Sequence, residues 1–217
     1  MSLEAVIETA RLQLGISEDP PGSNRVKYWE DYGPGWQGQP WCVCFLWWCF
    51  RAAGEEKAFF GGARTASCGT LLRWYEAQGH TVPAERAQPG DIVILNFSGK
   101  KGRDGKPDTE HCGLVTARED TPTLRFLTIE GNTSPREEGS QDNGGCVAMK
   151  TRLPRQIVGV CRPQYRPSDW AGHWAEEDIR RCLERGILRG YPDGSFRPEQ
   201  TVTRAELAAV LRRLGGN

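Results

Sequence analysis

The sequence lacks several features that would quickly assign it to a class. Its 217 residues carry 28 basic and 28 acidic side chains, so no excess charge favours nucleic acid or a membrane surface as a partner. No apolar run reaches the ~18 residues needed to span a bilayer, and we expect no membrane span. The first residues, MSLEAVIETA, lack a basic segment followed by an apolar one. We therefore expect no signal peptide, and synthesis in the cytoplasm, where thiols stay reduced.

The eight cysteines follow neither a disulfide nor a metal-binding pattern. No CxxC pair occurs, and the cysteines lie inside apolar helix and strand patterns, which favours buried free thiols. A zinc site is the alternative, with ligands drawn from Cys42, Cys44, Cys49, His111 and Cys112. Because these spacings do not match known zinc motifs, we predict no metal and no other cofactor.

The most apolar stretch, QPWCVCFLWWCFRAA, predicts a buried helix over residues 41–53. Cys42 would lie in its first turn, near unpaired backbone N–H groups and the positive end of the helix dipole, which favour a thiolate. Cys44 would lie about 200° around the helix from Cys42, and Cys49 would lie ~10 Å further along the axis. Cys42 is therefore the candidate nucleophile, and the alternative is one more core residue.

The segments around this helix predict an α+β domain over residues 1–162. Along the chain, most helices are expected first, and the strands of an antiparallel sheet follow them. The further helices are expected at 3–14 and 67–78, and the strands at 91–97, 111–117, 124–130, 146–151 and 157–161. Pro163 and Pro167 then bracket a linker at 163–168. Residues 169–217 read as a small α-helical unit, with amphipathic helices at 175–185 and 203–214.

A cysteine nucleophile needs a base, and the chain has only three histidines, His80, His111 and His173. His80 lies in a turn after a helix, and His173 lies in the C-terminal unit. His111 opens the expected strand HCGLVTA, where a histidine is better placed for catalysis. His111 is therefore the candidate base.

The hairpin formed by the second and third strands tests whether His111 has an orienting partner. If it pairs symmetrically, opposed residue numbers sum to 241, and Glu130 lies opposite His111 on the same face. Glu130 would then hold the ring, and Asn132 would be a further candidate on the same side. A shift of one residue would send Glu130 to the other face.

Taken together, PWCVCFLWWCF, PGDIVIL, HCGLV and TIEGNTS resemble the CHAP family of peptidoglycan amidases and endopeptidases, within the papain-like and NlpC/P60 group. The resemblance covers about residues 3–162 and includes the order and spacing of the motifs. It implies a papain-like fold with N-terminal helices packed on an antiparallel sheet. PPGSNRVKY, TASCG and EGNTS are similar to CHAP lysins of bacterial genomes and prophages. Some family members bind calcium, but the acidic residues of segment 16–40 form no recognisable calcium loop.

The resemblance also implies catalytic roles. The family's nucleophile falls on Cys42, its base on His111 and its orienting acid on Glu130, with Asn132 from the same motif. The thiolate would attack an amide of the wall peptide, and the resulting thioester would be hydrolysed. Backbone N–H groups near Cys42 would stabilise the oxyanion, and Gln39 is a candidate side-chain donor.

The C-terminal unit, with TRAE at residues 203–206, resembles one S-layer homology (SLH) repeat. Such repeats anchor proteins to secondary cell-wall polysaccharides, which are often acidic. The resemblance places Asp169, Trp174, Gly190 and Arg204 near a polymer-binding groove. The guanidinium of Arg204 suits an anionic sugar, and the alternative is that it braces the helix pair. The family usually groups three repeats, so either three chains assemble as a homo-trimer, or one repeat binds weakly, or it serves another contact.

We therefore predict a cell-wall peptidoglycan hydrolase, a cysteine-dependent amidase or endopeptidase with an SLH repeat that binds wall polysaccharide. The alternative is a non-catalytic wall-binding protein with a degenerate CHAP domain. Without a signal peptide, release by lysis or through a holin is expected, as for prophage endolysins.

Overall fold

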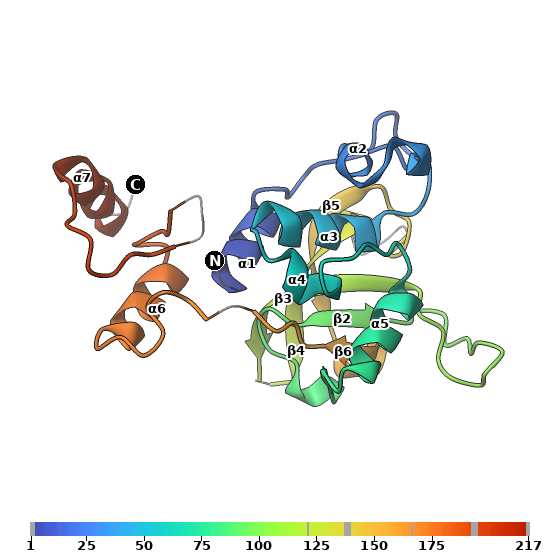
Figure 1. Ribbon diagram of the computed structural model, residues 1–217. Helices are drawn as coiled ribbons and strands as arrows, with labels where there is room; N and C mark the ends of the chain where they lie inside the picture. Colours follow the sequence, from blue (N-terminus) through green and yellow to red (C-terminus); the bar gives the residue numbers. More distant parts are fainter. Residues whose placement is uncertain (1–2, 121, 137–139, 166, 192–194, 216–217) are drawn as a thin grey trace.

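The computed structural model describes residues 3–120, 122–136, 140–165, 167–191 and 195–215, and has the expected α+β architecture (Figure 1). The helices of the first region are α1 (Leu3–Arg11), α2 (Tyr28–Tyr32), α3 (Cys42–Ala52), α4 (Glu56–Phe60) and α5 (Cys68–Ala77). Its strands are β1 (Thr81–Val82), β2 (Ile92–Leu95), β3 (His111–Glu119), β4 (Arg125–Thr133), β5 (Cys146–Arg152) and β6 (Ile157–Cys161). The C-terminal helices are α6 (Glu176–Glu184) and α7 (Arg204–Leu214). No helix among these described residues is long and apolar enough to cross a membrane.

The six strands form one antiparallel sheet in the order β1-β6-β2-β3-β4-β5. Its two faces are buried in two separate clusters of apolar side chains. The larger cluster joins α1, α3 and α5 to one face through side chains such as Ile94 and Leu114. The smaller cluster, with Val93, Val115 and Phe126, covers the other face. Consecutive residues of β2 and β3 therefore pack into different clusters, because side chains alternate between the two faces along a strand.

The expected helices 41–53 and 67–78 are confirmed as α3 and α5, and the long strands also lie where the sequence places them. The hairpin register is wrong, however. β3 and β4 pair with Leu114 opposite Ile129 and, beyond a bulge, Ala117 opposite Leu127, so opposed residue numbers sum to 243 and 244. A bulge adds one residue to one strand, and neither it nor the turn geometry can be read from the hydrophobic pattern.

The residues expected to form a linker begin by packing on the first region. The Tyr165 hydroxyl donates to the Gly90 carbonyl at 2.7 Å, and its ring stacks on Phe50 with ring centroids 5.7 Å apart. Figure 1 shows α6 and α7 as a separate unit, reached along the chain after β6. In that unit Thr203 caps α7, because its side chain accepts from the Glu206 N–H while the Glu206 carboxylate accepts from the Thr203 N–H.

Candidate active site

Cys42 is the first residue of α3, and the helix is held tightly against the sheet. Trp41, which precedes Cys42, and Phe45, which lies about one helical turn after it, are fully buried. At Gly131 in β4, an added Cβ would lie 2.6 Å from the Phe45 Cβ and 2.8 Å from the Trp41 ring. Only a glycine permits this close approach of helix and strand. The glycine of the IEGN motif therefore allows the start of α3, with Cys42, to lie close to β4.

His111 and Glu130 are brought together in a way that differs from the predicted pairing. His111 Nε2 lies 3.1 Å from Glu130 Oε2, off the line of a straight hydrogen bond, and both side chains are fully buried. Continuing the register from Leu114 places Glu130 opposite Gly113. A Cβ at Gly113 would lie 2.7 Å from the Glu130 Cγ. The missing side chain at Gly113 thus leaves the space through which Glu130 reaches His111.

Arg152 at the end of β5 completes this group, and sequence reasoning missed it. Its Nε donates to Glu130 Oε1 at 2.8 Å and its Nη2 donates to Oε2 at 2.6 Å, so the two side chains form a bidentate ion pair. The Thr128 hydroxyl also donates to Oε1 at 2.6 Å. Burial alone would raise the pKa of Glu130, but its interactions with Arg152 and His111 lower it to about 2. Glu130 is therefore a carboxylate at neutral pH despite its burial.

The Cys42 thiol has two thiol neighbours as well as the His111 ring. The Sγ atoms of Cys42 and Cys68 are 3.8 Å apart, and the Sγ of Cys112 lies within 4.8 Å of both. Interactions with Cys112, Cys68 and His111 lower the pKa of Cys42 well below its ordinary value, in spite of burial. Although burial lowers the pKa of His111, Cys42 and Glu130 raise it to about 9. The arrangement favours a thiolate beside an imidazolium.

The contact between His111 and Glu130 indicates which ring nitrogen is left for Cys42. Because Nε2 adjoins Glu130, Nδ1 is the nitrogen left to exchange a proton with the thiol. The other sequence candidates on α3, Cys44 and Cys49, are buried, and burial raises the pKa of both thiols. They are core residues, as the helix geometry predicts.

Asn132 does not join this group. Its Nδ2 donates to Asn143 Oδ1 at 3.0 Å, and its Oδ1 accepts from the Gly145 N–H at 3.4 Å. Its backbone has a φ of 59°, in the left-handed region that asparagine tolerates better than most residues. These contacts hold the strand end of β4 to the segment before β5. Among the described residues, no hydrogen bond joins the Asn132 amide to His111.

Access to the site is narrow, since Cys42 is 5% exposed and His111 is fully buried.

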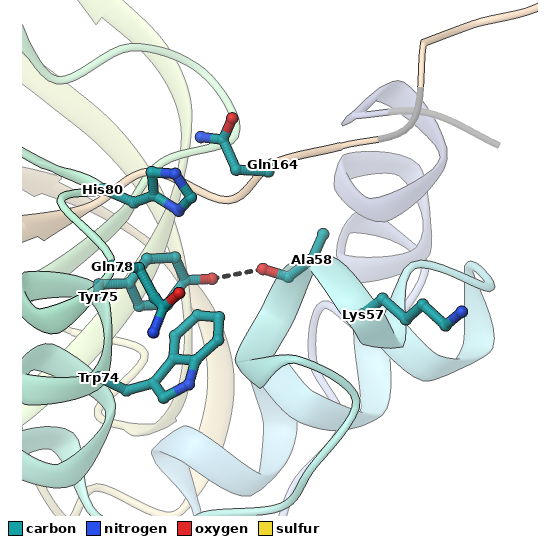
Figure 2. A pocket seen from close by; sticks show the side chains of 7 residues that line it. All are labelled: Lys57, Ala58, Trp74, Tyr75, Gln78, His80 and Gln164. Atoms are coloured by element: carbon teal, nitrogen blue, oxygen red, sulfur yellow. Dashed lines mark hydrogen bonds between the residues drawn. The ribbon is translucent and has the colours of Figure 1, made fainter.

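Figure 2 shows a hollow away from this site, between α4 and the end of α5, where the Tyr75 hydroxyl donates to the Ala58 carbonyl. His80 lines this hollow, whereas Cys68 lies at the other end of α5, ~15 Å away at the rise of a helix. His80 is therefore no partner for Cys42, and a second hollow, around Arg25 and Gln37, is not lined by Cys42 or His111 either.

The four residues predicted to line a polymer groove play different parts in the structure. The Asp169 carboxylate accepts from the backbone N–H groups of Phe196 and Arg197 at 2.6–3.0 Å, so it holds the turn before α7. A Cβ at Gly190 would lie 3.0 Å from the Ser195 carbonyl oxygen.

The other two groove candidates are on the surface. Trp174 is 87% exposed, with its ring 5.4 Å from the His173 ring, and Arg204 is exposed at the start of α7. An indole and a guanidinium in such positions are available to a ligand. Asp169 and Gly190, in contrast, have structural roles, and these roles explain the two residue types without a ligand.

Comparison with known families finds two matches in the chain. The family model described as "CHAP domain" matches residues 33–132, and the one described as "S-layer homology domain" matches residues 168–208. The chain contains a CHAP domain and an SLH domain. The CHAP match includes Cys42, His111, Glu130 and Asn132, and it ends before Arg152.

Curated relatives match short stretches of the chain. The outer membrane protein SlpA of Deinococcus radiodurans is 52% identical over 44 residues, which is 20% of this chain and 4% of that protein. The cellulosome-anchoring protein of Acetivibrio thermocellus is 42% identical over 45 residues, 21% of this chain and 10% of that protein. The S-layer protein of Bacillus licheniformis is 36% identical over 73 residues, 31% of this chain and 8% of that protein. The chain thus spans a tenth or less of these relatives.

Proposed function

We propose that this protein is a cysteine-dependent peptidoglycan hydrolase that cleaves an amide bond of the wall peptide. The observation that carries the proposal is the thiol of Cys42 at a helix start, beside a buried His111 that Glu130 contacts at 3.1 Å. A nucleophile, a base and a group that orients the base are the three parts that such chemistry needs.

Each residue has a defined step in this mechanism. The Cys42 sulfur attacks the amide carbon, and the carbon–nitrogen bond breaks as His111 gives its proton to the departing amine. His111 then takes a proton from water, the water oxygen attacks the thioester, and the Cys42 thiolate leaves. Glu130 stabilises the imidazolium, and Arg152 holds Glu130 in place.

The oxyanion is stabilised by backbone groups at the start of α3. The N–H of Cys42 belongs to the first turn, where amides have no intrahelical acceptor. Gln39 precedes it on the surface and is a second candidate donor. We assign Asn132 to holding the loop before β5 rather than to the proton transfers, because its amide is bonded to Asn143 and Gly145.

The decisive experiment compares wild type, Cys42→Ala and Cys44→Ala on purified bacterial walls. Cys42→Ala should clear walls at least ~10³-fold more slowly, while Cys44→Ala should keep most of the activity. Equal clearing by wild type and Cys42→Ala would refute the mechanism. If wild type clears no wall, the alternative of a non-catalytic wall-binding protein is favoured. Mass spectrometry of the released fragments distinguishes an amidase from an endopeptidase.

We further propose that the SLH domain binds an acidic wall polysaccharide through Trp174 and Arg204. An exposed indole can stack on a sugar ring, and a guanidinium pairs with carboxylates. The double variant Trp174→Ala/Arg204→Ala should sediment less with walls and cleave soluble wall peptides as wild type does. Trp36→Ala, which alters an exposed tryptophan of the first region, is the matched control. Unchanged sedimentation of the double variant would refute the role.

The exposed face of α7 suggests that this domain also meets other copies. Leu207, Leu211 and Leu214 recur at helical spacing and are 47%, 59% and 56% exposed. Assembly as a homo-trimer would supply the three repeats that the family usually groups, and would cover these side chains.

A further inference from the structure

Three cysteine thiols meet at the candidate active site, and two of them have no part in the proton transfers. The Sγ atoms of Cys42, Cys68 and Cys112 all lie within 4.8 Å of one another, and all three side chains are buried. They come from α3, α5 and β3, which are far apart in sequence. Only the packing of both helices on the sheet brings them together.

The spacing of two of the sulfurs matches that of thiolates around a single ion, and the third lies within 4.8 Å of both. Zinc–sulfur bonds of ~2.3 Å at tetrahedral angles place two sulfurs ~3.8 Å apart. The Cys42 and Cys68 sulfurs are 3.8 Å apart. The ion would therefore fit with small side-chain adjustments, mainly at Cys112.

Two of these ligands lie at helix starts, although the pKa of Cys68 is raised well above its ordinary value because its interaction with Cys112, which lowers it, is outweighed by Cys42 and by burial. Cys42 is the first residue of α3, and Cys68 is the first residue of α5. Each sulfur is thus close to the positive end of a helix dipole, which stabilises negative charge on thiolates. Cys44 and Cys49 belong to α3 too, but they lie outside the cluster.

We propose that Cys42, Cys68 and Cys112 form a binding site for a thiophilic divalent cation such as Zn²⁺, and that the ion blocks the nucleophile. Each ligand that starts as a thiol releases its proton to water when its sulfur binds the ion. Three protein sulfurs leave the fourth tetrahedral position to water. Ion binding stands apart from the proposed hydrolase function, whereas the inhibition rests on it.

Binding is tested with the full chain, kept reduced with a phosphine, by titration with Cd²⁺. Thiolate ligation to Cd²⁺ gives an ultraviolet charge-transfer band whose intensity scales with the number of bound thiolates. We expect saturation at one equivalent with an intensity for three thiolates, reversed by a chelator. Because this readout uses wild type, it does not depend on a variant that folds.

Variants then identify the ligands. Cys68→Ala and Cys112→Ala should each weaken Cd²⁺ binding at least tenfold and lower the band by one thiolate, whereas Cys44→Ala should change neither. Absence of the band in wild type would overturn the proposal. So would a band of full intensity in Cys68→Ala or in Cys112→Ala.

Inhibition is measured as the ratio of wall clearing with and without one equivalent of Zn²⁺. Wild type and Cys44→Ala should be inhibited more than tenfold, and Cys68→Ala should lose most of that sensitivity. Equal sensitivity in Cys68→Ala would overturn the blocking role. If wild type clears no walls but gives the Cd²⁺ band, the ion site stands and the hydrolase proposal fails. If it clears walls without giving the band, the reverse holds.

Discussion

Helices α3 and α7 are both eleven residues long, yet they bury their apolar side chains to opposite extents. Eight residues of α3 are buried, whereas none of α7 is. α3 lies between the sheet and other helices, so its first residue is fixed relative to β3 and β4. α7 has an apolar face that the described chain leaves open. The difference suggests that the first region is built for fixed geometry and the second for contact with other molecules.

The largest effect should come from the buried pair of Arg152 and Glu130. Arg152→Met leaves a buried carboxylate without its main partner, and we expect a loss of about 3–5 kcal/mol in the free energy of unfolding. Denaturant titration measures it. The exposed pair of Arg125 and Glu119 is the matched control, and Arg125→Met should cost no more than about 1 kcal/mol.

The pH dependence of this loss has a defined sign. The pKa of Glu130 is lowered from 4.5 to about 2, so the ionised carboxylate stabilises the fold fully above pH 4.5 and progressively less below it. The difference between wild type and Arg152→Met should therefore shrink as the pH falls from 4.5 towards 2. A difference independent of pH would contradict this account.

Glu130→Gln should have the next largest effect, on activity. The pKa of His111 is raised to about 9, so the imidazolium is lost, and activity falls, as the pH rises through 9. Removing the Glu130 charge lowers the pKa of His111 and should shift this alkaline limb to lower pH, with roughly a 100-fold loss of rate. Rate–pH profiles measure both. Glu119→Gln is the control, and an unmoved limb in Glu130→Gln would contradict the assigned role.

Gly113→Ala tests the space through which Glu130 reaches His111. A Cβ there would lie 2.7 Å from the Glu130 Cγ, so the carboxylate must move, and activity should fall roughly 10-fold. Gly35→Ala is the control, because an added Cβ there meets no atom within 4 Å. Wall-clearing rates measure the effect. Equal rates for the two variants would show that the glycine is not needed.

The smallest effect on stability should come from α7. Leu211→Ser alters a side chain that is 59% exposed, so the unfolding free energy of the isolated chain should change by less than about 0.5 kcal/mol. If copies cover this face, light scattering should show a trimer for wild type and a smaller mass for Leu211→Ser. A monomer for wild type at high concentration would refute the trimer.

The elements and the positions of the two main candidate residues were predictable because their signals are local. An apolar run with Cys42 at its start fixes the buried helix, and an apolar strand pattern puts His111 at a strand mouth. Glu130 was predicted from a wrong register. Its side-chain face was nevertheless right, because a shift of two residues keeps a side chain on the same face of the strand, whereas a shift of one reverses it.

The sequence by itself determined the α+β class, the positions of α3 and α5, and the motifs that carry Cys42, His111 and Glu130. The tertiary structure alone decided that Arg152 grips Glu130 and that Cys68 and Cys112 meet Cys42. These contacts join segments separated by 22 to 70 residues, and they depend on strand order and on a helix approaching β4 at Gly131. Periodicity reports which face of an element is buried, but not which distant side chain it meets.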